Sequence, residues 1–467
     1  MEKFYGRERE LKELNLRYDD GNFECVVIYG RRRVGKTALI NEFLKGKPAI
    51  SLSALNTTGS ENLMALSKAI STYECPTSTS APVFPDYFSA FDRITELAKK
   101  GRVVLVIDEF PYLAKTYPAV SSMLQHLIDH AWAETGLFLI LCGSSMSFME
   151  RQVLGVESPL FGRRTAQFRI EPLDYREAAL FHPELSHEDN ALIYGITGGV
   201  PHYINKLNVR DSVDEALIAN VFKSTAYLYE EPANLLKQEL RDPGLYSAIL
   251  RAIASGGTRL NEIAGKTHES TGLVSNHLKT LKELGIVRRE TPMAETPGRK
   301  SFYLLQDSFF RFWFRFAPEN ASAINAGSFS KIYPTAVRRY LPDFMGNVFE
   351  LMCKQYLLKY AEGLPFPLGL VGQWWGADPI QKKQIQIDLV GKGAEPRRFL
   401  IGSCKYRNTS VGIDELELMR RYASAFGKGD RYDYCFFSKG GFTDGLREAA
   451  RETGAMLFTL EDLYRKD

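Results

Sequence analysis

The sequence predicts a mixed α/β protein with a parallel sheet in its N-terminal part and a second, smaller α/β domain at its C-terminal end. Three apolar runs, residues 25–29, 103–107 and 137–142, alternate with stretches of helical spacing, which is typical of a parallel sheet covered by helices. Further apolar strands follow residue 384. Because 467 residues exceed what one hydrophobic core holds, we expect several domains.

The composition is that of a soluble globular protein, and it excludes several functional classes. No apolar run approaches the roughly 18 residues of a membrane span, so we expect no membrane contact. The six cysteines never occur as C-x-x-C, which argues against a zinc site and favours the reducing cytoplasm. The net charge is only +3, so contacts with nucleic acid would have to come from local basic patches.

A glycine-rich stretch follows the first apolar run and carries the strongest motif of the chain. Residues 30–37 read GRRRVGKT and fit G-x-x-x-x-G-K-[ST] between a strand and a helix. Backbone N–H groups of such a loop bind phosphate oxygens, and the helix N-terminus adds a positive dipole. We expect Lys36 to reach the β- and γ-phosphates of a nucleotide and Thr37 to ligate Mg²⁺. The predicted nucleotide-binding residues of this loop are Gly30, Arg31, Arg32, Arg33, Val34, Gly35, Lys36, Thr37 and Ala38.

The second apolar run ends in two acidic residues that suit the same site. Residues 103–107 lead directly into Asp108 and Glu109. At the carboxyl end of a central strand, Asp108 can hold Mg²⁺ through water, and Glu109 can polarise a hydrolytic water beside the γ-phosphate. The alternative, a strand end with two solvated acids, is disfavoured by the glycine loop. ATP and Mg²⁺ are therefore the predicted cofactors.

Two pairs of polar residues are candidate phosphate sensors. Ser144 and Ser145 end the third apolar run, where a polar side chain would lie between the first two motifs. A plain serine-rich turn explains them equally well. Arg163 and Arg164 precede a further predicted strand, and either could be an arginine finger, although surface arginines are common.

Six short motifs follow one another between residues 4 and 204: FYGREREL, GRRRVGKT, VIDEFPYL, LCGSS, LFGRRT and GGVPHYI. Together they resemble the archaeal-type ATPases, a P-loop family near the AAA+ and STAND groups. The resemblance implies a parallel sheet of order 5-1-4-3-2, with Gly6 and Arg7 near the adenine. It also implies that residues 197–201 belong to a helical lid on the nucleotide. Asp174 and Glu177 form a capping-box pattern that would open this lid.

The segment after the lid has the pattern of a winged helix. Three helical patterns precede two strand-like segments that flank Pro297 and Gly298, which predicts a β-hairpin wing. By analogy with this fold, the third helix would enter the major groove of duplex DNA and the wing would contact phosphate. The alternative is a packing module, since the basic density is modest. The predicted DNA-binding residues are Ser275, Asn276, Lys279, Lys282, Arg299 and Lys300.

A dense aromatic block, SFFRFWFRF, follows the winged helix at residues 308–316. Aromatic side chains can stack nucleobases. They also bury the largest area of any residue type, so we expect this helix to be packed between domains instead. Similar blocks occur in the same ATPase family, where they lead into a C-terminal domain of restriction-endonuclease-like appearance.

The C-terminal strands carry an order of acids and lysine that resembles the PD-(D/E)XK nucleases. Glu350 lies on a predicted helix, Asp388 on a strand and Lys405 on the next strand. In such sites two carboxylates hold Mg²⁺ and the lysine stabilises the developing charge. The family pattern is Glu-x-Lys, whereas this chain has Ser403 before Lys405, and Gln386 where many relatives carry a further acid. We therefore expect a nuclease-like fold with an inert site, in which Asp388 and Lys405 pair with each other.

The sequence thus predicts a cytoplasmic ATP-binding protein and ATP hydrolase that couples its nucleotide state to double-stranded DNA. Two alternatives stay open: a STAND-like switch that acts through protein partners or self-association, and an ATP-regulated DNA nuclease. The predicted domains are a P-loop core (1–171), a helical lid (172–240), a winged helix (241–306), an aromatic linker helix (307–340) and a nuclease-like domain (341–467).

Overall fold

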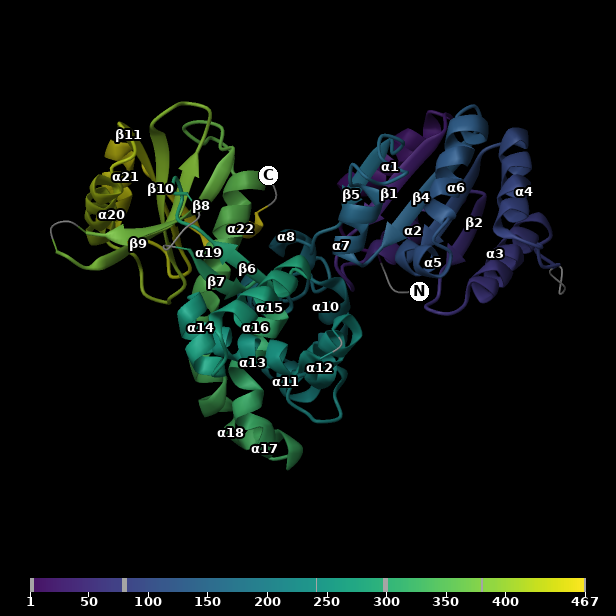
Figure 1. The fold of residues 1–467 in the computed structure, drawn as a ribbon. Helices are drawn as coiled ribbons and strands as arrows, with labels where there is room; N and C mark the ends of the chain where they lie inside the picture. The colour runs from purple at the N-terminus through teal and green to yellow at the C-terminus, as the bar shows by residue number, and fades with distance from the viewer. Residues whose placement is uncertain (1–3, 78–81, 241, 297–300, 379–380, 466–467) are drawn as a thin grey trace. The chain divides into compact units, whose positions relative to one another are not determined.

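The structure, a computed structural model, consists of two compact units (Figure 1). The first unit comprises residues 1–173 and 200–202, and the second comprises residues 174–199 and 203–467. Among the helices of the described residues, none combines the length and the apolar character required to cross a bilayer. The residues that the structure describes are 4–77, 82–240, 242–296, 301–378 and 381–465.

The first unit has three layers around a five-stranded parallel sheet of order β2-β3-β4-β1-β5, which confirms the predicted order 5-1-4-3-2 (Figure 1). Helices α1 and α2 cover one face of the sheet, and α3 to α6 cover the other. The strands are β1 (Glu24–Tyr29), β2 (Ala49–Ser53), β3 (Val103–Asp108), β4 (Leu137–Gly143) and β5 (Ala166–Arg169). The helices are α1 (Glu8–Asp19), α2 (Lys36–Phe43), α3 (Gly59–Glu74), α4 (Tyr87–Lys100), α5 (Phe110–Thr116), α6 (Val120–Leu127) and α7 (Met146–Phe148).

The central strands are buried on both faces, which explains why the sequence shows them as unbroken apolar runs. Every residue of β1 and β4 is buried, and in β3 only the last residue, Asp108, is partly exposed. A parallel sheet covered by helices leaves no strand face to water, so polar residues occur where the strands end. The carboxyl ends of these parallel strands meet at one edge of the sheet, where the glycine loop and the two acids come together.

The second unit begins with a helical part that contains the predicted lid and winged helix. Asp174 and Glu177 form the predicted capping box at the start of α8. The winged helix consists of α13 (Pro243–Ala254), α14 (Leu260–Thr267), α15 (Thr271–Glu283) and the antiparallel hairpin of β6 (Val287–Glu290) and β7 (Phe302–Leu305). The other helices are α8 (Tyr175–Ala179), α9 (His187–Thr197), α11 (Val213–Asn220) and α12 (Tyr227–Glu239), together with α10 (Pro201–Leu207), whose first two residues belong to the first unit.

The aromatic block forms α16 (Ser308–Phe316), and its phenylalanines are buried. Phe310 and Phe314 belong to the core of the winged helix. On another side of α16, the ring of Phe312 lies 5.6 Å from that of Phe222 and 5.5 Å from that of Phe344, measured between centroids. The block therefore packs between parts of the second unit, as expected. Two short helices follow, α17 (Ala321–Asn325) and α18 (Phe329–Ala336).

The C-terminal domain is built on a mixed five-stranded sheet of order β12-β11-β10-β9-β8. Strand β9 runs antiparallel to both β8 and β10, whereas β10, β11 and β12 are parallel to one another. The strands are β8 (Leu370–Ala377), β9 (Gln384–Lys392), β10 (Arg398–Lys405), β11 (Arg431–Ser438) and β12 (Met456–Thr459). The helices are α19 (Leu341–Lys359), α20 (Ile413–Phe426), α21 (Asp444–Thr453) and α22 (Leu460–Tyr464).

Candidate functional site

The glycine loop connects β1 to α2, and its shape requires glycine. A Cβ atom at Gly30 would lie 2.3 Å from the carbonyl oxygen of Ile170, so no larger residue fits there. Gly35, directly before α2, has a φ of 94°, in the region that favours glycine. The loop thus turns sharply into the N-terminus of α2, the arrangement that turns backbone N–H groups toward a phosphate.

The other predicted residues of the loop follow the same turn. Arg31 and Arg33 are half-buried, and Arg32 donates a hydrogen bond of 2.8 Å to a tyrosine hydroxyl of α5. Val34 is buried in the core between the sheet and helices α1 and α2, and this burial anchors the loop. Ala38 is exposed in the first turn of α2.

Lys36 is the first residue of α2, and its own loop holds its side chain. Its Nζ donates hydrogen bonds to the carbonyl oxygens of Gly30 at 2.9 Å and Arg31 at 3.0 Å. The residue is buried, and this burial lowers its pKa below the usual value. Because neutral carbonyl groups hold the ammonium, a phosphate can replace them without the separation of an ion pair.

Thr37 and Asp108 bring two oxygen atoms together beside the loop. The hydroxyl of Thr37 donates to Oδ2 of Asp108 at 2.9 Å, while Oδ1 accepts from the backbone N–H of Glu109. Hydroxyl and carboxylate oxygens are ligands that Mg²⁺ accepts in nucleotide sites. These two residues therefore fit the magnesium ion that the fold implies.

Glu109 is held in place by its backbone and by a serine. It has a φ of 52°, a left-handed conformation that is rare and strained for a residue with a side chain. Its Oε2 accepts hydrogen bonds from the hydroxyl of Ser144 at 2.9 Å and from the backbone N–H of Ser144 at 3.3 Å. Of the two candidate serines, the structure thus brings Ser144 to the catalytic candidate. Ser145 precedes α7 and contacts neither of the two acids among the described hydrogen bonds.

Arg163 and Arg164 lie at the amino-terminal end of the strands, whereas the glycine loop lies at their carboxyl end. They precede β5, whose first residue Ala166 pairs with Val26 near the start of β1, whereas the loop follows the end of β1. The two arginines are therefore separated from the loop by most of the length of β1, roughly 17 Å for a strand of this length. This separation is beyond the reach of an arginine side chain. Arg163 also forms a two-point ion pair with Asp129, at 2.7 and 2.8 Å. Within one chain neither arginine lies at the glycine loop, and a role as an arginine finger stays a prediction.

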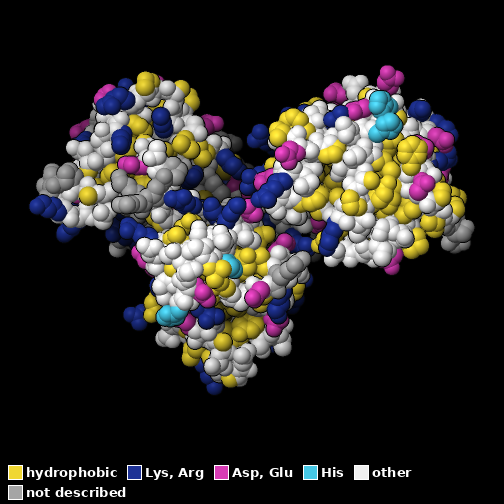
Figure 2. Space-filling model, in the orientation of Figure 1, with side chains coloured by type: hydrophobic (Ala, Val, Ile, Leu, Met, Phe, Trp, Pro, Cys, Tyr) yellow, Lys and Arg dark blue, Asp and Glu magenta, His cyan; other side chains and the backbone are white. Residues whose placement is uncertain are grey.

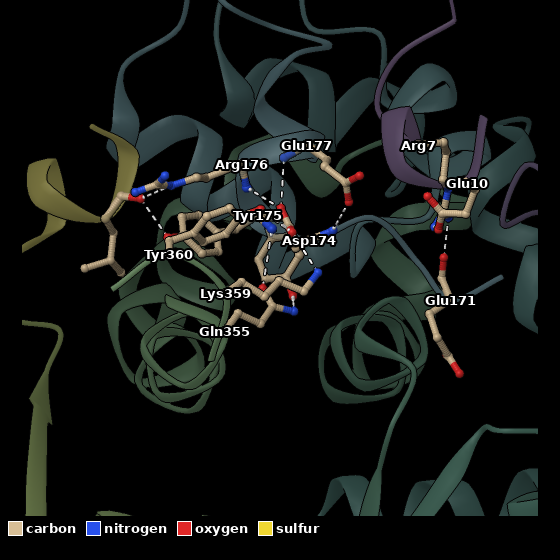
Figure 3. A network of polar contacts seen from close by, with 12 residues as sticks. Arg7, Glu10, Glu171, Asp174, Tyr175, Arg176, Glu177, Gln355, Lys359 and Tyr360 are labelled. Carbon is tan, nitrogen blue, oxygen red and sulfur yellow. Dashed lines mark hydrogen bonds and ion pairs between the residues drawn. The ribbon is translucent and has the colours of Figure 1, made fainter. Parts of the chain in front are cut away.

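Arg7 packs against the glycine loop. Its guanidinium donates to the carbonyl oxygens of Val34, at 3.2 Å, and of Glu171 (Figure 3). Pro201, from the sequence motif of the predicted lid, lies against the same loop, because a Cβ at Gly35 would be 3.7 Å from its Cγ. The structure thus places Arg7 and Pro201 beside the phosphate loop. Contact of Gly6 and Arg7 with adenine stays a prediction.

A polar network ties α8, the first helix of the predicted lid, to α19 and α22 (Figure 3). Asp174 accepts hydrogen bonds from Nζ of Lys359, at 2.8 Å, and from the hydroxyl of Tyr360. Burial raises the pKa of Asp174, but these hydrogen bonds outweigh it and hold the pKa below its usual value. Arg176 donates to the carbonyl oxygen of Leu463 at 2.7 Å. Asp174, the N-cap of the first helix of the predicted lid, is therefore fixed to the C-terminal domain.

The helix predicted to read DNA presents its polar face to solvent. Ser270 caps α15, and Val274, Leu278 and Leu281 turn into the core of the winged helix. The four predicted contact residues of this helix are all exposed: Ser275, Asn276, Lys279 and Lys282.

The wing, in contrast, packs against the C-terminal domain. Met293, shortly after β6, is buried in the core of that domain, and its N–H donates to the carbonyl oxygen of Gln373 at 2.7 Å. The ring of Phe302 on β7 lies 4.3 Å from that of Trp375. The interpretation as a packing module therefore holds for this part of the wing. Arg299 and Lys300 lie outside the described residues.

The predicted acid and lysine residues of the C-terminal strands lie close together. Oδ2 of Asp388 on β9 is 3.6 Å from Nζ of Lys405 on β10 and accepts from the backbone N–H of Cys404 at 2.9 Å. Glu350 on α19 accepts from the side-chain amide of Gln373. Burial raises the pKa of both carboxyl groups, and the charge of Asp388 raises that of Glu350 further. The expected ion pair between Asp388 and Lys405 is present.

A carboxylate that sequence reasoning missed stands beside Ser403. Glu415, in the first turn of α20, accepts a hydrogen bond from the hydroxyl of Ser403 at 2.6 Å and lies 3.2 Å from Nζ of Lys405. The charge count made from the sequence is therefore incomplete, because the cluster contains one more acid. The helical spacing of the sequence already indicates that Glu415 is buried, since it falls on the buried face of α20 with Leu416 and Met419.

This cluster does not fit a preassembled magnesium site. Within the part of the chain that the structure describes, no group of three His, Cys, Asp or Glu side chains could hold a metal ion. Nζ of Lys405 contacts both Asp388 and Glu415, and Ser403 also binds Glu415. The oxygens that Mg²⁺ would require already have partners, so no metal-dependent step is assigned to this domain.

Three family models match parts of the chain. Residues 4–207 match an ATPase domain found predominantly in Archaea, and residues 247–289 match bacterial regulatory proteins of the arsR family. Residues 313–416 match a family of archaeal and bacterial proteins of unknown function. The chain thus combines an ATPase domain with a helix-turn-helix.

The chain is similar over nearly its full length to an uncharacterized protein of Methanocaldococcus jannaschii. The two are 30% identical over 465 residues, which cover 98% of this chain and 99% of the relative. An uncharacterized ATP-binding protein of the same organism is 43% identical over 44 residues, or 9% of this chain and 75% of that protein. A solved Walker-type ATPase of Pyrococcus abyssi shares the fold, with a TM-score of 0.52 and 19% identity over 67% of this chain and 96% of that chain.

Proposed function

We propose that this chain, which belongs to the family of ATPases found predominantly in Archaea, hydrolyses ATP and couples its nucleotide state to DNA binding by the winged helix. Two contacts between hydroxyl and carboxylate groups carry the proposal: Thr37 to Asp108, and Ser144 to Glu109. The first contact provides oxygen ligands for Mg²⁺, and the second orients a general base. Hydrolysis of a nucleotide requires both.

In the proposed reaction, Lys36 leaves the carbonyl oxygens of its loop and binds the β- and γ-phosphates. A Mg²⁺ ion held by Thr37 and Asp108 would neutralise the charge that develops on the phosphates. Glu109, oriented by Ser144, accepts a proton from the attacking water, which turns that water into a nucleophile. The strained backbone of Glu109 fixes where this carboxylate points.

The DNA-binding part of the proposal rests on the exposed face of α15. Its polar and basic side chains are free to contact a duplex, whereas the wing is committed in part to packing. Few basic residues take part, so we expect weak binding that falls steeply with salt. The six cysteines are all free thiols, which suits the reducing cytoplasm, where we propose that the protein acts.

A nucleotide switch without turnover is the second candidate function. The network around Asp174 favours it, because movement of the lid would be passed to α19 and the C-terminal domain. Steady-state release of phosphate from ATP separates the two functions. Multiple turnovers in the parent protein, lost in Glu109→Gln, would support hydrolysis, whereas tight ATP binding without phosphate release in the parent would support the switch.

A further inference from the structure

The second unit contains a cavity of about 370 Å³ where the winged helix meets the C-terminal domain. Residues of β6, β7, α16, α19, β8 and β9 line it, among them Glu350 and Asp388 of the acid and lysine cluster. Figure 2 shows Lys and Arg side chains gathered at the surface in this part of the second unit. The basic residues that line the cavity are Arg288, Arg311, Arg315 and Lys354.

Two of these four cations lack an acidic partner. Arg288 pairs with Glu290 at 2.9 Å, and Arg315 pairs with the exposed Asp343 at 2.6 Å. Arg311 and Lys354 form no ion pair with any residue that the structure describes. Burial lowers the pKa of Lys354, and the charge of Glu290 opposes this only in part. Arg311 and Lys354 thus line the cavity without an ion-pair partner, although the acids Glu350 and Asp388 line other parts of the same cavity.

Arg311 points most directly to a missing ligand. Its Nε is buried and has no hydrogen-bond partner in the described part of the chain, and its guanidinium lies 4.7 Å from the centre of the Phe344 ring. Burial, and then the charges of Arg288 and Arg315, lower its pKa to about 10. A buried cation without an acceptor destabilises the protein. An anion bound in the cavity would remove that penalty.

The chemistry of the cavity indicates a phosphate group. A guanidinium binds phosphate oxygens through paired N–H donors, and a lysine adds a point charge. A volume near 370 Å³ suits a ligand of nucleotide size but not a duplex. A single strand or a frayed end that reaches the winged helix could therefore place one nucleotide there.

We propose that this cavity binds a phosphate group of a single nucleic-acid strand through Arg311 and Lys354. The site goes beyond the proposed function, because duplex binding by α15 and ATP hydrolysis do not require it. It gives the C-terminal domain a role in binding, which agrees with a cluster that is not arranged for a metal ion.

The test measures binding of a fluorescein-labelled single-stranded oligonucleotide by anisotropy, with EDTA to exclude cleavage and excess ADP to occupy the glycine loop. The double variant Arg311→Met, Lys354→Met should bind about tenfold more weakly or worse, since two charged contacts are lost. The matched control is Arg451→Met, an exposed cation on α21 of the same domain, which should bind as the parent does. Parental affinity in the double variant would overturn the proposal.

Stability separates a binding role from a structural one. Arg311→Met removes a desolvated charge and keeps the volume, so its melting temperature should equal or exceed that of the parent. A lower melting temperature with unchanged oligonucleotide affinity would make Arg311 structural and overturn the proposal. If Arg311→Met does not fold, Lys354→Met alone must weaken binding, or the proposal fails.

Two further binding measurements identify the ligand. Inorganic phosphate or a nucleoside monophosphate that binds in an Arg311-dependent manner, while the oligonucleotide does not, would overturn the assignment to a nucleic-acid strand. The variant Lys279→Ala, Lys282→Ala on α15 should lose duplex binding and keep single-strand binding. Loss of both in that variant would show that the winged helix alone binds nucleic acid, and would overturn the cavity proposal.

Discussion

The two units each place a lysine near carboxylates, yet they hold that lysine in different ways. Lys36 donates to two carbonyl oxygens of its own loop, and hydroxyl groups bind the neighbouring carboxylates. Lys405 instead lies 3.6 Å from Asp388 and 3.2 Å from Glu415. The first lysine has neutral partners, whereas the second is part of a buried ion-pair cluster.

The pKa values of the two lysines shift in opposite directions. Burial lowers the pKa of Lys36. Burial acts in the same direction on Lys405, but the charges of Asp388 and Glu415 outweigh it and raise the pKa. To release Lys405 toward a phosphate, the cluster would have to leave buried carboxylates unpaired, which is strongly unfavourable. Similar residue types therefore predict catalysis in one unit and a structural or binding role in the other.

The largest effect is expected from Lys36→Ala. This change removes the ammonium that binds the β- and γ-phosphates, so tight ATP binding should be lost. Titration with a labelled ATP analogue measures it, with Lys99→Ala, an exposed lysine of the same unit, as the control. Equal affinity in Lys36→Ala and the control would remove the basis for the nucleotide site.

The next effect in size concerns Glu109→Gln. The amide keeps the shape of the side chain but cannot accept a proton from water, so ATP should still bind while phosphate release falls by about a hundredfold or more. A coupled phosphate assay measures the release. Turnover at the parental rate would show that Glu109 is not the general base.

Ser403→Glu tests the C-terminal side of the comparison. The new carboxylate would meet Glu415, which lies 2.6 Å from the serine hydroxyl, and two buried anions at this distance should destabilise the domain by about 3 kcal/mol. Urea denaturation measures the loss. The exchange variant Ser403→Glu, Glu415→Ser should recover most of the stability.

The metal affinity of the exchange variant Ser403→Glu, Glu415→Ser gives a second measurement on the C-terminal lysine site. It restores the Glu-x-Lys order of the nuclease family on β10, so a titration with Mn²⁺ asks whether the geometry of that site remains. Gain of Mn²⁺ affinity would show a nuclease geometry that the present residues keep inert. If Ser403→Glu alone is as stable as the parent, the contact between Ser403 and Glu415 is not formed.

The expected effect on duplex DNA binding is smaller again, because few basic residues take part. Replacement of Lys279, Lys282, Arg299 and Lys300 by alanine should remove binding and its salt dependence, because phosphate contacts release counterions. The pair on α15 should account for most of the loss, since that face is exposed. A quadruple variant that shifts duplex as well as the parent does would leave the whole winged helix a packing module.

The smallest effect separates the two adjacent serines. Ser144→Ala should lower phosphate release about tenfold with unchanged ATP affinity, because it removes a hydrogen bond that orients Glu109. Ser145→Ala is the matched control and should be close to the parent. Equal rates in both variants would mean that the contact seen between Ser144 and Glu109 does not matter for turnover.

Sequence could predict the nucleotide site because its parts are local. The glycines, Lys36 and Thr37 are contiguous, and Asp108 with Glu109 ends a strand whose apolar run is easy to recognise. For Ser144 and Ser145 the sequence allows a phosphate sensor and a plain turn equally, since both use the same residues. Sequence could not decide between them because the choice depends on how β3 and β4 align in the sheet.

The second unit shows where sequence reasoning stops. Glu415 comes from a helix ten residues after Lys405, and its contact depends on how α20 packs on β10. Met293 is an ordinary apolar residue within a predicted hairpin, and nothing in the local pattern shows that another domain covers it. Arg311 lies within an aromatic block, where the spacing predicts burial of its neighbours but not the cavity that the guanidinium lines.

The most direct test of the comparison measures both hydrolytic activities in one reaction. The purified protein is incubated with supercoiled plasmid and Mg²⁺ or Mn²⁺, with and without ATP, and phosphate release and plasmid nicking are followed together. We predict phosphate release that Glu109→Gln abolishes, and no nicking under any of these conditions. Nicking that disappears in both Asp388→Ala and Lys405→Ala would contradict the account, because it would show that the buried ion-pair cluster is a catalytic site.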